Sequence, residues 1–438
     1  MNFRKICVLG LGYIGLPTAS TFATHGIDVT GVDANPQVLE TLKNGGLHIH
    51  EPGLRTVVEA AIKSGKLTVS AQPEEADAFL IAVPTPFYMD KTGEYNGETY
   101  KLADMRAVTS ATEAIVPFLR KGNLVVLEST SPPRTTIDLV RPILERSGLE
   151  VGPDLHLAYS PERVLPGQIL RELIENARVI GGATPESAQA GAALYSVFVK
   201  GDIIQTDATT AEMVKLMENT YRDVNIAIAN EFSRLAERFG VDVWEAISLA
   251  NRHPRVKILS PGPGVGGHCI SVDPWFFVET APDLTPLIYT SRRVNDEQPH
   301  YVMALVQKAL GSLKGKKIAA LGLAYKPDVD DLRESPAAEA VHLLLDAGAD
   351  VRAYEPFRPE GLPGIPMAAS FQDAIHGADA ILLLVRHTQF TGMKPAEVAA
   401  ATSARVLVDT ANVWGNKDWE KAGFEVFRLG DGKRTKSA

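Results

Sequence analysis

Hydrophobic and polar positions alternate in two different periods along the first third of the chain. Short apolar or β-branched runs at Lys5–Leu9, Asp28–Val32, Ala78–Ala82 and Leu124–Glu128 are separated by longer segments with helical spacing. Further runs of both kinds continue through about residue 204. This alternation is typical of a parallel sheet whose strands are joined by helices. The pattern therefore predicts an α/β domain over residues 1–205.

The period changes in the middle of the chain. Apolar residues recur at intervals of three and four between residues 206 and 237, which predicts one long amphipathic helix or two in succession. Helical patterning continues through Trp244–Asn251, stops at a loop rich in glycine and proline, and resumes to about Asn295. We therefore expect a central α-helical domain over residues 206–297.

The α/β pattern restarts in the last third of the chain. The segment KKIAALGLAYKPD indicates a strand and a loop, and ILLLV and RVLVDT indicate two further strands. This part resembles a second Rossmann-like half whose glycine turn is eroded. The predicted fold class is α/β, with two Rossmann-like parallel-sheet domains, at 1–205 and 298–438, joined by the helical domain.

Composition narrows the possible functions. The chain has 438 residues, 45% of them hydrophobic, and a formal net charge of −9, which favours neither nucleic acid nor an anionic membrane as a partner. Its two cysteines, Cys7 and Cys269, cannot build a disulfide framework or a four-thiolate zinc site, and no metal site is predicted. No apolar run approaches the roughly 20 residues of a membrane span. We expect a soluble cytoplasmic protein.

A glycine-rich turn follows the first predicted strand. Gly10, Gly12 and Gly15 form G-x-G-x-x-G, with Tyr13 and Ile14 between the last two glycines. Such glycines allow a tight turn, backbone approach to a pyrophosphate, and close packing of helix on strand. Asp33 ends the next strand, where a carboxylate would bind the adenosine ribose and repel a 2′-phosphate. The pattern predicts an NAD site, and the alternative is a glycine turn without a ligand.

Two further motifs follow later strands of the first domain. VPTP carries Pro84 and Thr85, and EST carries Thr130. Ligands of open α/β sheets collect at the carboxyl ends of the strands, so we expect these residues near the cofactor. The alternative for Thr130 is an N-cap of the following helix.

Cys269 stands in PGPGVGGHCISVDPWFF, directly after a glycine-rich stretch. Closely spaced backbone N–H groups at 262–267 would stabilise a thiolate or an oxyanion. A nicotinamide site together with one poised thiol suggests that an alcohol is oxidised to an aldehyde, trapped on sulfur, and oxidised again to an acid. Adjacent His268 is expected to contact substrate or loop, with a structural role favoured.

Four polar residues are candidates for helping the thiol. Lys215 and Asn219 are four apart on the predicted helix and so share one face, where an amine and an amide would hold the oxygen of a tetrahedral intermediate. Glu162, in SPER, and Asp273 are candidates for proton transfer or for orienting water. The alternative for all four is a solvated surface position.

The order of these motifs resembles the UDP-glucose/GDP-mannose 6-dehydrogenase family over about residues 4–425. GLGYIGLP, VPTP, EST, YSPER, AEMVKLMENTYRDVNIAIANE, GPGVGGHC and GLAYKPDVDDLRESP occur in the family's order. ENTYRDVNIA, NRHPRV and GGHCISVDPWF are most similar to members that act on UDP-N-acetyl-D-mannosamine. The resemblance implies an N-terminal NAD domain, a central dimerisation domain, a C-terminal UDP-binding domain, and a homodimer that makes a uronic acid for polysaccharide biosynthesis.

The resemblance also implies roles for individual residues. Cys269 would be the nucleophile, Lys215 and Asn219 would stabilise the oxyanion, and Asp273, Glu162 and Thr130 would handle protons and water. The substrate site would include Glu162, Arg163, Val164, Lys215, Asn219, Gly266, Lys326 and Arg333, with Arg252 or Arg255 reaching the neighbouring subunit's substrate. One departure is Val272, where many UDP-glucose dehydrogenases carry lysine, and it disfavours glucose as the substrate sugar.

Several rival functions remain open at this point. Within the family, these are UDP-N-acetylglucosamine 6-dehydrogenase and UDP-glucose 6-dehydrogenase. A single-step hydroxyacid dehydrogenase would also join a Rossmann domain to a long helix, but it would need neither Cys269 nor a third domain. A nucleotide-sugar sensor without turnover is disfavoured, because Lys215, Asn219, Cys269 and Asp273 occur together.

Overall fold

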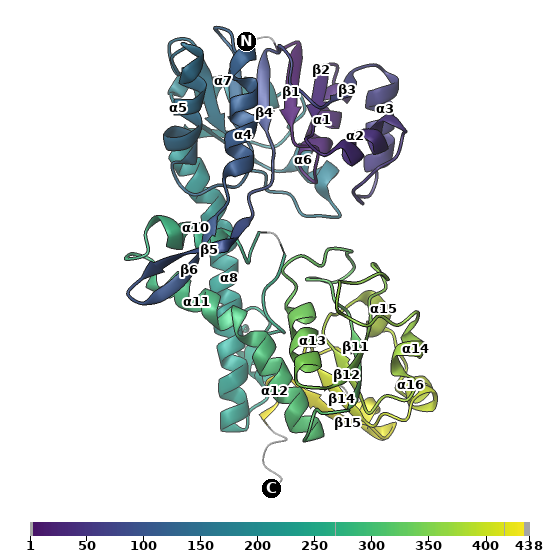
Figure 1. Cartoon of the computed structure of the whole chain (residues 1–438). Coiled ribbons are helices and arrows are strands. Elements are labelled where there is room, and N and C mark those ends of the chain that lie inside the picture. Colours follow the sequence, from purple (N-terminus) through teal and green to yellow (C-terminus); the bar gives the residue numbers. More distant parts are fainter. Residues whose placement is uncertain (1–2, 268, 416, 433–438) are drawn as a thin grey trace. The chain divides into compact units, whose positions relative to one another are not determined.

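The computed structural model describes residues 3–267, 269–415 and 417–432 (Figure 1). The chain divides into two compact units. The N-terminal unit comprises Met1–Glu218 and Trp275–Leu284, and the C-terminal unit comprises Asn219–Pro274 and Thr285–Ala438. The three-domain division at 205/206 and 297/298 stays a prediction.

An eight-stranded sheet forms the centre of the N-terminal unit. Its order is β10 (Ile203–Asp207), β9 (Arg178–Gly182), β8 (His156–Tyr159), β7 (Leu124–Leu127), β4 (Ala78–Ile81), β1 (Lys5–Leu9), β2 (Asp28–Val32) and β3 (Leu67–Ser70). All neighbouring strands are parallel except β8 and β9. The four predicted strands are present, β4 and β7 each ending one residue early, whereas β3 was not predicted. The strand order reverses between β1 and β4, which is where such sheets bind ligands.

Helices cover both faces of this sheet, because successive side chains of each strand point to opposite faces. On β1, Ile6 and Val8 join one buried cluster, and Cys7 and Leu9 join another. Cys7 is fully buried, and burial raises the pKa of its thiol to about 12, so it is a core residue. The helices are α1 (Gly15–Thr24), α2 (Pro36–Lys43), α3 (Leu54–Lys63), α4 (Arg106–Ile115), α5 (Arg141–Leu144), α6 (Ile169–Glu175) and α7 (Pro185–Tyr195).

A hairpin and a returning segment complete the N-terminal unit. The hairpin pairs β5 (Phe87–Tyr95) with β6 (Glu98–Ala103). The segment Trp275–Leu284 contains most of α10 (Asp273–Thr280). Its Phe276 ring lies 6.2 Å from that of Phe87, and its Glu279 carboxylate accepts the Ala103 N–H at 2.8 Å.

The middle of the chain is helical, as predicted. Residues Ala208–Phe239 form a single helix of 32 residues, α8, rather than two in succession. The helices α9 (Val243–Ala250), α11 (Pro286–Asp296) and α12 (Gln298–Leu310) follow along the chain. Within the described ranges, none of the helices combines the length and the apolarity that a membrane crossing needs.

A second parallel sheet forms the core of the C-terminal unit. Its order is β12 (Asp350–Tyr354), β11 (Lys317–Leu321), β13 (Ala380–Leu383), β14 (Val406–Asp409) and β15 (Glu425–Arg428). The helices around it are α13 (Pro336–Asp346), α14 (Phe371–Ile375), α15 (Thr388–Thr391), α16 (Pro395–Ala401) and α17 (Lys417–Lys421). The predicted fold class, two Rossmann-like sheets and a helical region, is confirmed.

Candidate active site

The glycine turn after β1 has the shape that a dinucleotide pyrophosphate requires. Gly10 has φ +91°, and a Cβ there would lie 2.5 Å from the Ala82 carbonyl oxygen. A Cβ on Gly15 would lie 1.8 Å from the Gly10 oxygen. At Gly12, by contrast, a Cβ would meet no described atom within 4 Å. Two glycines therefore close the turn, and the third leaves open space beside the start of α1, so the turn fits a pyrophosphate.

Asp33 follows β2 directly and borders this turn. Its carboxylate accepts N–H groups from Leu11, at 2.9 Å, and Asn35, at 2.8 Å. The side chain is only partly buried, so further lone pairs of its two oxygens face outward. This arrangement suits the two hydroxyls of a ribose. Tyr13 and Ile14, in the same turn, are half-buried just before α1.

The structure brings the VPTP and EST motifs together. The Thr85 hydroxyl donates to the Thr130 carbonyl at 2.7 Å, and the Ser129 hydroxyl donates to the Val83 carbonyl at 2.7 Å. Pro84 is exposed between these contacts. Thr130 is not a helix N-cap, because the next helical segment begins at Thr136.

Glu162 lies inside the N-terminal unit and is 8% exposed. Its carboxylate accepts from the Arg178 guanidinium at 2.6 Å and from the Arg163 N–H at 2.8 Å. Arg178 also donates to the Ser160 hydroxyl at 2.9 Å. Two donors thus fix the orientation of a carboxylate that sequence reasoning assigned to proton transfer.

A second buried carboxylate, Glu128, shares the same arginine. The Tyr195 hydroxyl donates to Glu128 Oε1 at 2.5 Å, and Arg178 Nη1 lies 3.6 Å from the same oxygen. Burial raises the pKa of Glu128 to about 7; Arg178 opposes this rise and Glu162 adds to it. Sequence reasoning missed Arg178 and Tyr195, since a charged residue in an apolar strand gives no signal of its partner.

Arg163 and Val164 follow Glu162 in the same loop but point to different surroundings. The Arg163 guanidinium pairs with Glu218 at 2.5 and 3.1 Å, and it donates to the Ala177 carbonyl at 3.2 Å. Val164 packs against the hydrophobic core. The structure therefore ties Arg163 to the last residue of the N-terminal unit on α8.

In the C-terminal unit, the glycine-rich loop before Cys269 packs against a second loop. A Cβ on Gly266 would lie 2.4 Å from the Glu334 carbonyl oxygen, and one on Gly267 would lie 2.7 Å from the Tyr325 ring. The Gly267 N–H donates to the Arg333 carbonyl at 3.1 Å. Only glycine allows this approach, and Cys269, two residues on, is exposed. His268 lies outside the described residues.

Asn219 and Asp273 meet beside Cys269. The Asn219 amide donates to the Asp273 carboxylate at 2.5 Å, and the Asp273 N–H donates to the Cys269 carbonyl at 2.8 Å. Asn219 is 8% exposed and Asp273 1%. Lys215, one helical turn earlier on α8, is also 8% exposed. The alternative of solvated surface positions is therefore wrong for these three residues and for Glu162.

The loop after β11 carries the two predicted substrate contacts of this unit. Lys326 is half-buried with Nζ 5.9 Å from the centre of the Tyr325 ring, and the Arg333 guanidinium pairs with Asp331 at 2.7 Å. Burial, with the electrostatic influence of Asp331 and of Cys269, raises the pKa of the Tyr325 hydroxyl to about 12. Sequence reasoning missed Tyr325, although it precedes Lys326 in the AYKPD motif.

Three other residues discussed from sequence lie elsewhere on the C-terminal unit. Arg252 and Arg255 are both exposed on the segment after α9, and a contact of either with a neighbouring subunit's substrate stays a prediction. Val272, the departure from the glucose enzymes, is 4% exposed.

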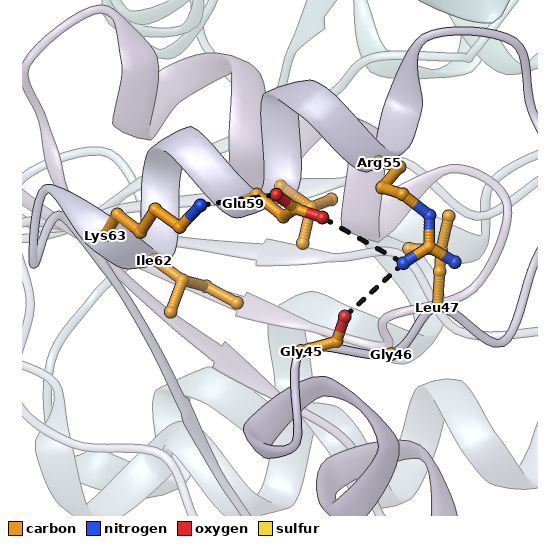
Figure 2. Close-up of a pocket in the computed structure, with 8 residues that line it drawn as sticks. Gly45, Gly46, Leu47, Arg55, Glu59, Ile62 and Lys63 are labelled. Carbon is orange, nitrogen blue, oxygen red and sulfur yellow. Dashed lines mark hydrogen bonds and ion pairs between the residues drawn. The ribbon is translucent and has the colours of Figure 1, made fainter.

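A pocket lies in the N-terminal unit, between the loop after α2 and the helix α3 (Figure 2). Its charged lining residues contact one another: Glu59 pairs with Lys63 at 3.4 Å, and Arg55 reaches the Gly45 carbonyl at 3.5 Å. None of the predicted site residues lines it.

A mostly parallel sheet with an open glycine turn and a carboxylate at the end of the second strand defines the N-terminal unit as a dinucleotide-binding domain. Three family models match it, those of the UDP-glucose/GDP-mannose dehydrogenase NAD binding domain (residues 4–199), central domain (209–297) and UDP binding domain (319–416). The chain belongs to the UDP-glucose/GDP-mannose dehydrogenase family, and it is an enzyme that uses NAD.

Individual relatives are similar over their whole length. UDP-N-acetyl-D-mannosamine dehydrogenase of Methanocaldococcus jannaschii is 47% identical, covering 98% of this chain and 97% of its own. NDP-N-acetyl-D-galactosaminuronic acid dehydrogenase of Ralstonia nicotianae is also 47% identical, covering 95% and 98%. The solved UDP-D-ManNAc dehydrogenase from Pyrococcus horikoshii is 39% identical with a TM-score of 0.89, covering 98% and 100%.

Proposed function

We propose that this enzyme oxidises the C6 hydroxyl of UDP-N-acetyl-D-mannosamine to the uronic acid in two NAD-dependent steps. The observation that carries the proposal is the arrangement of Cys269, Asn219 and Asp273 in a chain that aligns end to end with enzymes named for this sugar. An exposed thiol on a residue whose backbone binds Asp273, the partner of the Asn219 amide, suits an oxidation that passes through an aldehyde.

Bound NAD+ supplies the hydride acceptor for each of the two oxidations. The first removes a hydride from C6 and a proton from its hydroxyl group, and it leaves an aldehyde. Cys269 Sγ then adds to that carbonyl carbon, and the thiol proton passes to the carbonyl oxygen, giving a thiohemiacetal. Loss of a second hydride and a proton leaves a thioester, and water cleaves it to the carboxylate and the free thiol. One alcohol thus yields one acid and two NADH, and covalent capture retains the aldehyde between the steps.

The chain's polar residues have separate roles in these steps. The Asn219 amide, held by Asp273, would donate to the sugar oxygen that becomes negative, and Lys215 would add positive charge one helical turn away. Glu162, oriented by Arg178, would accept protons from the hydroxyl or from the attacking water, with Thr130 holding that water. Lys326 and Arg333 would contact the UDP part of the substrate.

The stoichiometry of NADH tests the reaction, and a panel of sugars tests the substrate. We expect two NADH for each UDP-N-acetylmannosamine consumed, with UDP-N-acetylglucosamine and UDP-glucose oxidised more slowly. Two NADH on another sugar would keep the mechanism and replace the substrate. One NADH with accumulated aldehyde would refute the role of Cys269.

A second substrate is favoured by a specific comparison. The Ralstonia relative named for N-acetylgalactosaminuronic acid is as similar to this chain, at 47% identity, as the mannosamine enzyme of Methanocaldococcus. UDP-N-acetylgalactosamine therefore belongs in the panel, since epimers differ at single stereocentres that a few contacts distinguish. A higher kcat/KM for UDP-N-acetylgalactosamine than for UDP-N-acetylmannosamine would identify it as the preferred substrate.

We further propose that two copies pair through α8 in a cytoplasmic homodimer whose product serves polysaccharide biosynthesis. Within the C-terminal unit, exposed apolar residues follow one face of α8, at Tyr221, Ile228, Phe232, Leu235 and Phe239. Their intervals of seven, four, three and four match a helix-packing face. The double variant Phe232→Glu/Leu235→Glu should sediment as a monomer, while Gln307→Glu, at an exposed position of α12, should not. A wild-type monomer would contradict the proposal.

A further inference from the structure

The turn after β11 in the C-terminal sheet aligns residue by residue with the cofactor turn after β1 in the N-terminal sheet. Gly10 N–H donates to the Val32 carbonyl at 2.7 Å, and Gly322 N–H donates to the Tyr354 carbonyl at 2.9 Å. Both glycines have left-handed φ, +91° and +85°. The sequences LGLGYIG and LGLAYKP align from this glycine, so the first glycine is kept and the other two are replaced by Ala324 and Pro327.

The acid at the end of the second strand is also repeated, but its surroundings differ. Asp33 accepts the Leu11 N–H at 2.9 Å, and Glu355 accepts the equivalent Leu323 N–H at 2.7 Å. Asp33 is partly exposed, whereas Glu355 is completely buried. Glu355 also accepts the N–H groups of Ala324 and Phe357, both at 3.0 Å. A ribose therefore has no access to this acid.

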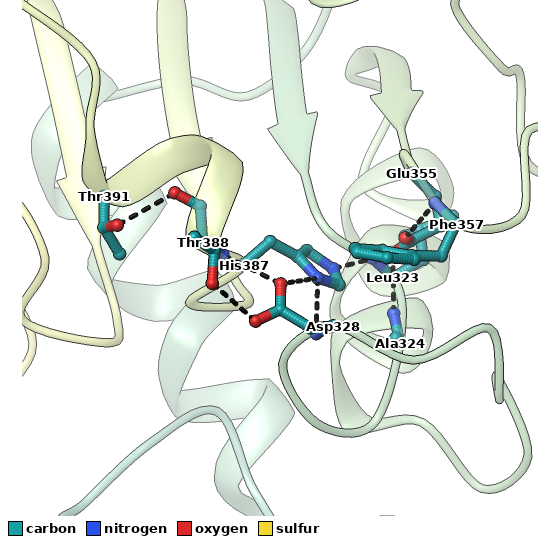
Figure 3. Close-up of polar contacts among 8 residues, drawn as sticks. All are labelled: Leu323, Ala324, Asp328, Glu355, Phe357, His387, Thr388 and Thr391. Carbon is teal, nitrogen blue, oxygen red and sulfur yellow. Dashed lines mark hydrogen bonds and ion pairs between the residues drawn. The ribbon is translucent and has the colours of Figure 1, made fainter. Parts of the chain in front are cut away.

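The buried side chain of His387 covers Glu355 and connects it to the neighbouring loop (Figure 3). Its Nδ1 accepts the Asp328 N–H at 2.9 Å, because a backbone N–H can only donate. The ring hydrogen is therefore on Nε2, which lies 3.1 Å from Glu355 and donates to it. Burial acts to raise the pKa of Glu355, but the hydrogen bonds from His387 and the backbone outweigh it and hold that pKa below its usual value.

Asp328 is held from its other side by Thr388. The Thr388 N–H and hydroxyl donate to the Asp328 carboxylate at 2.9 and 2.6 Å (Figure 3). Asp328 has φ +59°, a conformation that residues other than glycine rarely adopt. These contacts fix the backbone two residues after Lys326, at the position where the cofactor turn would have continued into a helix.

We propose that His387, supported by Glu355, is a positioning residue that holds the Lys326 loop in the shape that binds the diphosphate of the nucleotide sugar. In the turn after β11, Lys326 takes the place of the helix N-terminus that binds phosphate in a dinucleotide site. Glu355, at the position of the ribose-binding acid, is buried and instead holds His387. This inference rests on the proposed function, because it gives Lys326 a nucleotide-sugar ligand.

Two substitutions separate the two nitrogens of the ring. His387→Asn keeps an acceptor near the Nδ1 position, and His387→Gln keeps a donor near the Nε2 position. We expect His387→Gln to raise the Kd for UDP and the KM for the UDP-sugar about tenfold, the factor to which one lost buried hydrogen bond corresponds. His387→Asn should raise both values less, and kcat at saturating UDP-sugar should stay near that of the wild type.

Controls distinguish positioning from general stability. Thr388→Val removes a contact at the surface and should raise the KM for the UDP-sugar without lowering the melting temperature. Thr402→Val removes a buried hydrogen bond, 2.6 Å long, from the end of α16 to the Ile375 carbonyl at the end of α14 in the same unit, and should lower the melting temperature without changing UDP binding. In every variant the Kd for NAD+ should be unchanged.

Each outcome bears on a separate claim. Equal loss of UDP and NAD+ binding in His387→Gln, unchanged UDP binding, or a Thr402→Val effect on UDP of the same size would overturn the positioning role. The proposed function fails independently if the wild-type enzyme forms no NADH with any UDP-sugar.

Discussion

The buried carboxyl group of Glu128, which shares one arginine with Glu162, makes the stability of the N-terminal unit depend on pH. Glu128 is fully buried, and among the described residues its Oε2 accepts no hydrogen bond. Arg178 supplies one positive charge to two carboxylates, at 2.6 Å from Glu162 and 3.6 Å from Glu128. The substitution Glu128→Gln removes one negative charge and keeps an oxygen that accepts from Tyr195.

The sign follows from the direction of the shift. Burial raises the pKa of Glu128 to about 7, whereas in the unfolded chain it titrates near 4.5. Its contribution to stability is therefore complete below pH 4.5 and is lost as pH rises through 7. The difference corresponds to about 3 kcal/mol. The new amide lacks a partner, which costs about 1–2 kcal/mol. Glu128→Gln should thus be about 1–2 kcal/mol more stable than wild type at pH 8 and less stable at pH 5.

Urea unfolding at pH 5, 6.5 and 8 measures the difference in the free energy of unfolding between Glu128→Gln and wild type. Hydrogen exchange of the β7 and β9 amides then shows that the difference belongs to the N-terminal unit. Arg178→Met provides the opposite control, because two buried carboxylates without a cation should cost about 3–5 kcal/mol at pH 8 and less at pH 5. A difference between Glu128→Gln and wild type that is the same at all three pH values would refute the reasoning.

Three further substitutions test the sites by activity. Gly266→Ala should lower kcat about 100-fold by displacing the cysteine loop, because its Cβ would lie 2.4 Å from the Glu334 oxygen. The control Gly262→Ala, whose Cβ meets no described atom within 4 Å, should leave kcat unchanged. Equal effects of the two substitutions would contradict this account. Asp33→Asn should raise the KM for NAD+ about tenfold in steady-state assays, and an unchanged KM would exclude a ribose contact. Cys269→Ser should lower kcat by about three orders of magnitude or more in an NADH assay, and full turnover would remove it as nucleophile.

Most of the regular structure could be predicted from the sequence, because buried strands and amphipathic helices carry strong periods. The hairpin of β5 and β6 was missed because its strands are polar and largely exposed. Its turn did carry a signal, since Asn96 and Gly97 both have left-handed φ, at 53° and 79°. In a short, exposed pair of strands, this turn dipeptide is the sole sequence signal, because the strands have no apolar face that would give an alternating pattern.

The candidate site was predictable where function requires particular residues in a fixed order. Glycines that approach other backbone, such as Gly10 and Gly266, are recognisable within their motifs. The partners that fix Glu162 and Lys326 were not, because burial brings together side chains from distant strands. Tyr195 and Glu128 are 67 residues apart, and no periodicity relates His387 to Glu355.

The return of residues 275–284 to the N-terminal unit has a consequence for the order in which the chain folds during synthesis. A nascent chain that ends at Glu218 contains the whole eight-stranded sheet but lacks Phe276 and Glu279, the partners of the hairpin. The ribosome must add 284 − 218 = 66 further residues before this unit is complete, which takes about 3–13 s at ordinary rates of elongation. Throughout that interval, the β5–β6 hairpin has been synthesised but lacks two partners. Phe87 has no Phe276 ring to pack against, and the Ala103 N–H has no Glu279 carboxylate to bind.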